Sequence, residues 1–235
     1  MTNRTESTPT NPTTNRSAIG RRVGIGAIAL AAMVGVPAGV VMMNQSGAGS
    51  NDEQASIRTV AAVEASARDF NVDNVHSSVI FRVKHLGVTH FFGRFNTVSG
   101  TYRLDMENPA NSAIDITIDV NSVDSNNAGR DRHLKSPDFF NAPQFPNATF
   151  KATGFERAGD DTLRVTGDLT IRGTTRSVTL DVQHTGEGDR GGNFGYRGGF
   201  YAETTINRQD FGVSYLPEGL SNEVKLIISI QGIAR

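Results

Sequence analysis

The stretch VHSSVIFRVKHLGVTHFFGRF, which runs from Val75 to Phe95, alternates apolar and polar side chains with a period of two residues. Successive side chains of a β-strand point to opposite faces, so this alternation predicts a strand with one apolar face. The apolar face would consist of Val79, Phe81 and Val83. Arg82 and Lys84 would lie on the opposite face, and Gly87 would end the strand. The stretch therefore predicts one wall of a sheet whose apolar face turns inward.

The same alternation recurs along the chain and predicts about eight strands. They cover residues 79–84, 93–104, 114–120, 147–153, 163–171, 178–182, 200–207 and 224–230. Glycine-rich turns at 186–192 and 193–199 and a tight hairpin at Arg172-Gly173-Thr174 separate neighbouring strands, and one connection, from Ser122 to Pro146, is long. Eight antiparallel strands can close into a barrel that either fills with side chains or holds one small ligand. A two-sheet sandwich would show the same periodicity.

Composition excludes several classes of protein. The net charge of −1 argues against a nucleic-acid partner, which would require a clear basic excess. The chain has no cysteine, so disulfides, thiolate metal centres and cysteine nucleophiles are absent. A chain of 235 residues is nevertheless long enough to bury a core without such cross-links.

The N-terminal part of the sequence predicts export. Residues 1–22 form a polar tail with four arginines and one glutamate, and residues 23–43 form an uncharged run of 21 residues. As a helix this run would span roughly 31 Å, enough to cross a bilayer with the arginine-rich end in the cytoplasm. The alternative is a signal sequence that is cleaved after export. In both cases residues 44–68 would be a linker or stalk and residues 69–235 the exported domain.

No motif of metal binding or catalysis stands out. Successive histidines in the opening stretch are nine and five residues apart, whereas two ligands on one face of a strand are expected two residues apart. The chain has no G-x-S-x-G nucleophile motif and no G-x-x-x-x-G-K phosphate loop. We therefore expect no metal site and no catalytic residues. An enzyme that acts on a lipid is the less favoured alternative.

Five phenylalanines lie at strand ends or in the long connection. They are Phe91, Phe92, Phe139, Phe140 and Phe145. Such a cluster either plugs one end of a barrel or forms the apolar mouth of a ligand pocket, and the two roles can coexist.

Four pieces of the chain, taken in order, resemble the YceI-like family. The pieces are VDNVHSSVIFRVKHLGVTHFFGRFNTVSGTYRLD (72–105), ITIDVNSVDSNNAGRDRHLKSPDFFNAPQFPNATFKATG (116–154), VTGDLTIRGTTRSVTLDV (165–182) and TTINRQDFGV (204–213). The resemblance covers about residues 70–233 and implies a lipocalin-like, eight-stranded antiparallel barrel with an internal apolar channel. It also implies binding of a polyisoprenoid lipid, such as an isoprenoid quinone or a polyprenyl chain, by an exported bacterial protein that has no known catalytic mechanism.

Given this resemblance, the inward-facing side chains become candidates for the lining of the channel. They are Phe81, Val83, Ile116, Ile118, Phe150, Leu169, Ile171, Leu180, Val182, Ile206, Leu226 and Ile228. Candidates for the mouth and for head-group binding are Phe91, Phe92, Arg94, Arg130, His133, Phe139, Phe140 and Arg208. The alternatives are a fully packed core and, for the arginines, local ion pairs of Arg130 with Asp131 and of Arg208 with Asp210.

The sequence thus predicts noncatalytic binding, sequestration or transport of an isoprenoid lipid in the bacterial cell envelope. The lipid is the ligand and no other cofactor is expected. The domain would lie outside the cytoplasm, either tethered to the inner membrane by the N-terminal helix or released after signal cleavage. A structural or partner-binding envelope barrel with a filled core is the alternative, and a homodimer remains open.

Overall fold

A computed structural model describes residues 67–235 of the chain. The predicted cytoplasmic tail, the apolar run 23–43 and all but the end of the predicted linker lie outside the described residues. Within the described part, no helix has both the length and the apolar character needed to span a bilayer.

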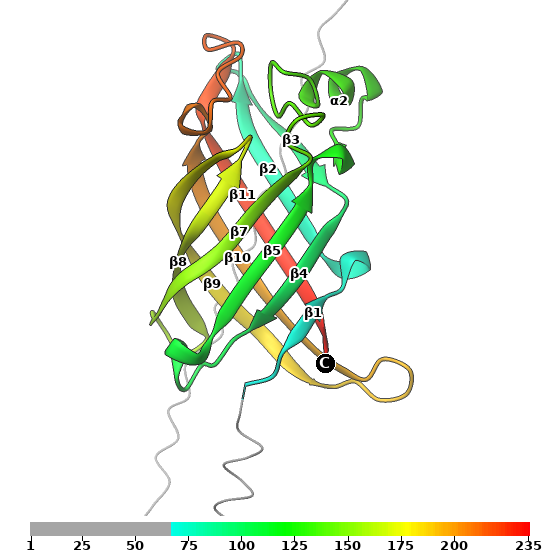
Figure 1. The fold of residues 1–235 in the computed structure, drawn as a ribbon, viewed down its shortest axis with the longest axis vertical. Helices are drawn as coiled ribbons and strands as arrows, with labels where there is room; N and C mark the ends of the chain where they lie inside the picture. The colour runs from blue at the N-terminus through cyan, green and yellow to red at the C-terminus, as the bar shows by residue number, and fades with distance from the viewer. Residues whose placement is uncertain (1–66) are drawn as a thin grey trace, which may run out of the picture. The chain divides into compact units, whose positions relative to one another are not determined.

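The described part is almost entirely β-structure (Figure 1). Its strands are β1 (Phe70–Val72), β2 (Ser78–His85), β3 (Thr89–Phe95), β4 (Val98–Arg103), β5 (Ala113–Asp119), β6 (Val123–Asp124), β7 (Asn147–Arg157), β8 (Thr162–Ile171), β9 (Thr174–Asp189), β10 (Tyr196–Asn207) and β11 (Leu220–Ala234). Short 3-10 helices are η1 (Asn74–His76), η2 (Pro109–Asn111), η3 (Val120–Ser122) and η4 (Arg208–Phe211), and the one α-helix described is α2 (Ala128–Leu134).

These segments form a closed antiparallel barrel with eight strand positions around its circumference, each called a wall below. β1 and β2 both pair with β11, so they act as one wall that η1 interrupts. In the same way β3 with β4, and β5 with β6, each form one wall. Each of the remaining five long strands is a wall of its own, and the first wall pairs with the last. The predicted eight-stranded barrel is therefore confirmed, because a sandwich would leave unpaired edges.

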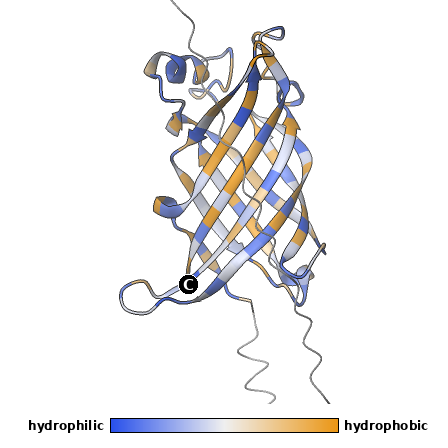
Figure 2. Cartoon of the chain, turned by 180° about the vertical axis from the view of Figure 1, so that it is seen from behind, coloured by the Kyte–Doolittle hydropathy of each residue, from blue (hydrophilic) through white to orange (hydrophobic). Residues whose placement is uncertain are grey.

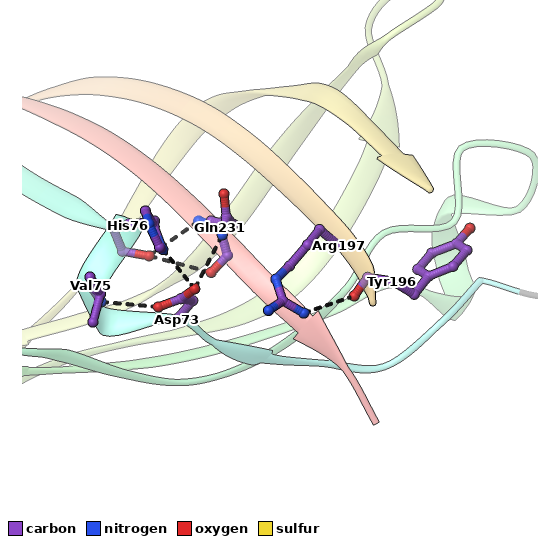
Figure 3. A network of polar contacts seen from close by, with 7 residues as sticks. Asp73, Val75, His76, Tyr196, Arg197 and Gln231 are labelled. Atoms are coloured by element: carbon purple, nitrogen blue, oxygen red, sulfur yellow. Dashed lines mark hydrogen bonds and ion pairs between the residues drawn. The ribbon is translucent and has the colours of Figure 1, made fainter. Parts of the chain in front are cut away.

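The break between β1 and β2 is bridged by side chains (Figure 3). Gln231 on β11 pairs with Gly199 on β10, but on its other side it faces the gap and has no strand partner. Its N–H donates to Ser77 Oγ at 3.1 Å, and its carbonyl accepts from the Asp73 N–H at 2.8 Å. The Asp73 carboxylate in turn accepts from Val75 N at 3.1 Å and Gln231 Nε2 at 3.1 Å, and lies 2.9 Å from His76 Nδ1. Asp73 and Ser77 together therefore replace the strand hydrogen bonds that η1 removes.

Asp73→Asn is expected to lower the free energy of unfolding at neutral pH, and to lower it less at acidic pH. The His76 hydrogen bond, with those from Val75 and Gln231, lowers the pKa of the Asp73 carboxyl below its usual range, against the opposing effect of burial. A lowered folded-state pKa stabilises the fold above about pH 4, and this contribution is lost as the pH falls through the folded pKa. We expect the variant to be less stable by about 1 kcal/mol at pH 7, with a difference that shrinks toward pH 2. Urea unfolding at a series of pH values measures it.

Asp160→Asn is the control for this series, since Asp160 is exposed in the β7–β8 turn. A constant difference between wild type and Asp73→Asn from pH 7 to pH 2 would contradict the assignment.

Hydrophobic and hydrophilic residues alternate along the strands, as Figure 2 shows. The inward residues at the end of the barrel that holds β1 pack tightly. Phe70 and Tyr102 stack with their ring centroids 5.0 Å apart, and Tyr102 meets Phe200 edge to face, also at 5.0 Å. Leu163 and Val165 beside them are fully buried. This end of the barrel is a filled core.

One predicted turn is confirmed by the structure, and another is shorter than predicted. The hairpin at Arg172-Gly173 is confirmed, with φ of 50° and 71°, as a type I′ turn requires. The β9–β10 turn, however, spans only the residues between Asp189 and Tyr196, so most of the predicted turn 186–199 is strand. Gly198 is a residue of β10, where the Phe70 ring packs so close that an added Cβ would lie 2.7 Å from it. The glycine at this position therefore makes room for the ring and does not mark a turn. A register shift follows Gly199.

Candidate ligand-binding cavity

A cavity of about 590 Å³ occupies the half of the barrel opposite the filled core. Its volume lies within the range of small-molecule pockets in proteins. Three connections surround its opening: the β2–β3 turn, the long connection that contains α2, and the segment from η4 to β11. These lie at the upper end of Figure 1, and the C-terminus lies at the lower end. The apolar space is therefore a pocket open at one end, since aromatic packing closes the other.

Seven of the twelve predicted lining residues border this cavity. They are Phe81, Val83, Ile118, Leu169, Ile171, Ile206 and Leu226. The other five lie in or against the packed core outside the cavity lining. They are Ile116, Phe150, Leu180, Val182 and Ile228. The strand period placed all twelve on the inner side, but it carries no information on how deep in the barrel each one lies.

Two glycines set the position of large rings inside the barrel. Phe81 pairs with Gly93 across β2 and β3, and a Cβ at position 93 would lie 2.2 Å from Cζ of the Phe81 ring. A Cβ at Gly167 would lie 2.5 Å from Cζ of Phe150. The glycines therefore let both rings approach the backbone of the neighbouring strand, which any larger side chain at positions 93 and 167 would prevent.

Six of the eight predicted mouth residues line the cavity. They are Phe91, Arg130, His133, Phe139, Phe140 and Arg208. Phe92 and Arg94 instead lie on the outer face of β3, because Phe91, Gly93 and Phe95 take the inner positions of the alternation. Phe92 is half exposed, and Arg94 Nε donates to Asn96 Oδ1 at 2.6 Å.

Arg130 covers one side of the mouth. Its guanidinium lies 4.2 Å above the centre of the Phe91 ring, a cation–π geometry. Its Nε donates to Ser125 Oγ at 2.9 Å and its Nη2 to the Ser125 carbonyl. The Asp131 carboxylate accepts from Ser125 N at 2.8 Å. Arg130 and Asp131 therefore both bind Ser125, and they do not form the ion pair considered as an alternative.

Arg208 is buried on the other side of the mouth, with 5% of its surface exposed. Its guanidinium donates to four backbone carbonyls and forms no ion pair with Asp210. The carbonyls belong to Val213 (2.9 Å), Tyr215 (2.8 Å), Leu220 (3.1 Å) and Ser221 (3.0 Å). Burial lowers the pKa of the Arg208 guanidinium, which still remains protonated. Its role is to fold the segment between η4 and β11 over the mouth.

His133 contacts residues from both sides of the mouth. Its ring meets Phe139 at 5.0 Å and Tyr215 at 4.9 Å between centroids, both in edge-to-face geometry. Its Nε2 lies 2.8 Å from Asp138 Oδ2. Across residues 67–235, no three His, Asp or Glu side chains gather closely enough to hold a metal ion. The contacts of His133 are therefore those of a residue that packs the mouth.

Several lining residues carry no signal in the sequence. The chain from the end of η4 to the start of β11 contributes Phe211, Val213, Tyr215, Leu216 and Leu220 to the cavity. Three of these residues lie in the connection itself, Phe211 ends η4, and Leu220 precedes a register shift in β11, so strand periodicity cannot assign them an inner side. Leu134 at the end of α2 is a similar case. Phe95, by contrast, follows the alternation of β3 and was predictable from it.

Comparison with known proteins agrees with this architecture. A family model described as the YceI-like domain matches residues 70–232. Protein YceI of Escherichia coli is 42% identical over 175 residues, which cover 74% of this chain and 91% of that protein. The crystal structure of Burkholderia cenocepacia BcnA matches with a TM-score of 0.63 and 26% identity, over 69% of this chain and 99% of that one. A polyisoprenoid binding domain from Saccharophagus degradans matches with a TM-score of 0.54 at 16% identity, over 72% of this chain and 100% of that one, a likeness of fold.

Proposed function

Because this chain belongs to the YceI-like family, we propose that its barrel binds an isoprenoid lipid in the cavity and sequesters or carries it without chemical change. The observation that supports this proposal is the cavity itself, which is lined almost wholly by aliphatic and aromatic side chains. A branched, apolar chain suits such a lining, since its burial is favourable by about 25 cal/mol for each Å² removed from water. The fold also occurs in the polyisoprenoid binding domain of Saccharophagus degradans.

The polar groups of the mouth suit a head group. Arg130, His133 and Arg208 line this part of the cavity together with His85, Thr89 and His90. The donors of Arg130, His133 and Arg208 mostly bond to protein groups already, so we propose that these residues frame the head group while the apolar wall holds the chain. An isoprenoid quinone and a polyprenyl chain both meet this description.

The proposal places the domain outside the cytoplasm of a bacterial cell. The basis is the sequence of residues 1–43, with its arginines ahead of a long uncharged run. An uncleaved run would tether the barrel to the inner membrane, and a cleaved one would release it. Edman sequencing of the mature protein distinguishes these two cases.

Lipid mass spectrometry tests the proposed function. The full chain is purified from a bacterial host without added lipid, and its organic extract is analysed. We expect an isoprenoid in near-stoichiometric amount, or its uptake when ubiquinone is added. Repeated absence of any isoprenoid, together with no binding of added ubiquinone or polyprenol, would reject the proposal and favour a structural barrel.

A further inference from the structure

The rim of the cavity carries exposed apolar side chains on two loops that contact each other. Leu86 and Val88 in the β2–β3 turn are 60% and 82% exposed, and Tyr215 and Leu216 in the segment after η4 are 40% and 41% exposed. The Leu86 N–H donates to the Gly219 carbonyl at 2.7 Å, which joins the two loops. These four side chains, called the rim patch below, therefore lie on neighbouring loops at the open end.

Local backbone preference does not explain the two leucines. Leu86 has a φ of 50° and Leu216 a φ of 51°, both in the left-handed region. Leu86 is the first central residue of a type I′ turn, where Asn, Asp or Gly is the usual choice. Aliphatic side chains that are exposed at unfavourable backbone positions indicate a role outside the fold itself.

The rim patch is continuous with the inside of the cavity. Tyr215 and Leu216 belong both to the rim patch and to the cavity lining. His85 and Thr89, on either side of the β2–β3 turn, also line the cavity. A lipid chain that crosses the rim at Tyr215 and Leu216 therefore passes from exposed apolar groups directly to the cavity lining.

Charge is distributed unequally between the two ends of the barrel. The mouth connections (84–90, 125–146, 171–175 and 207–221) carry six basic and four acidic side chains. The basic ones are Lys84, Arg130, Arg132, Lys135, Arg172 and Arg208, and the acidic ones are Asp131, Asp138, Asp210 and Glu218. The connections at the closed end (104–112, 157–162 and 187–197) carry three basic and six acidic side chains. An anionic surface would thus attract the mouth and repel the closed end.

We propose that the rim patch docks the open end of the barrel on a lipid bilayer that contains anionic lipids. Leu86, Val88 and Leu216 would enter the interface between head groups and acyl chains, and the surrounding basic side chains would contact the head groups. The mouth would then open directly onto the membrane. This inference rests on the proposed function, because it supplies the route by which a membrane lipid reaches the cavity.

Vesicle sedimentation tests the proposal with residues 67–235. This part suffices, because its sheet closes on itself around its own core and the matched BcnA chain consists almost entirely of the same barrel. The vesicles are phosphatidylcholine, with or without phosphatidylglycerol. We expect the barrel to sediment with the anionic vesicles, and Leu86→Glu with Val88→Glu to lower the partition coefficient by about tenfold or more, since both apolar area and charge attraction are lost.

The matched control is Val75→Glu with Phe194→Glu. Val75 is as exposed as Val88, at 82%, and Phe194 is 68% exposed, but Val75 lies in η1 and Phe194 in the turn at the closed end. This pair changes the net charge equally and is expected to leave vesicle binding within about twofold, because the docking surface is intact. Equal losses in both pairs would overturn the proposal, as would a wild-type barrel that does not sediment.

Two further outcomes are separable. If the rim patch pairs two copies of the chain, light scattering will show a dimer that Leu86→Glu with Val88→Glu dissociates, and the membrane proposal fails. If isoprenoid uptake from detergent fails while vesicle binding persists, the proposed function fails and the docking surface stands. If uptake from detergent persists while vesicle binding is absent, the docking proposal fails and the proposed function stands.

Discussion

Val224→Trp is expected to empty the cavity of lipid while the barrel still folds. Val224 lies on β11, lines the cavity and pairs with Val83 on β2 and Ile206 on β10, which also line it. Its side chain is only partly buried, so an indole at this position enters open space instead of a packed core. We expect the indole to occupy the volume that a lipid chain would fill. Isoprenoid recovered per mole of protein should then fall at least about tenfold, which corresponds to about 1.4 kcal/mol of binding free energy.

Ile227→Trp is the matched control for this substitution. Ile227 lies three residues further along β11 and is also partly buried, but its side chain points to the outer face of the barrel, where it pairs with Ile80 and Glu203. Both variants add the same indole to the same strand, so a general effect of tryptophan on β11 would appear in both. Undiminished lipid in Val224→Trp, with a thermal midpoint like that of wild type, would place the lipid elsewhere on the protein.

Arg208→Met is expected to have the largest effect on stability. The substitution keeps much of the apolar length of the side chain but leaves four carbonyl groups without their donor. A buried polar group without a partner costs about 1–3 kcal/mol, and water that enters the opened segment would recover part of this. We expect the free energy of unfolding to fall by about 3 kcal/mol in urea titrations, since several carbonyls are affected. The segment from η4 to β11 should also become sensitive to proteases.

Two variants decide whether the geometry or the charge of Arg208 matters. Arg208→Lys keeps the charge, but an ammonium group cannot reach carbonyls spread around a planar guanidinium, so it should recover only part of the stability. Arg130→Met removes another arginine of the mouth, one that is exposed, makes a cation–π contact and donates to a single carbonyl, that of Ser125, and should cost about 1 kcal/mol, less than Arg208→Met. Equal losses in Arg208→Met and Arg130→Met would show that Arg208 does not hold the mouth segment.

Some residues of the site could be predicted from the sequence, and others could not. Alternation along β2, β5, β8 and β11 predicted which side chains face inward. The same alternation along β3, with Phe91 on the inner face, could also have excluded Phe92 and Arg94 from the cavity. The glycines of β9 and β10 misled the turn assignment, because Gly198 accommodates the distant Phe70 ring. A local pattern does not reveal such a contact between strands far apart in the sequence.

By itself, the sequence determined the strands, their inner faces, the tight Arg172-Gly173 turn and the family, because each of these depends on local periodicity or on ordered motifs. Only the tertiary structure decided that the first wall pairs with β11, that one half of the barrel is filled by packed aromatic rings, and that the other half is open. It also decided that Arg208 binds four carbonyls instead of Asp210. The physical reason is that packing density inside a barrel depends on side chains from all eight walls together, and alternation along one wall does not encode that sum.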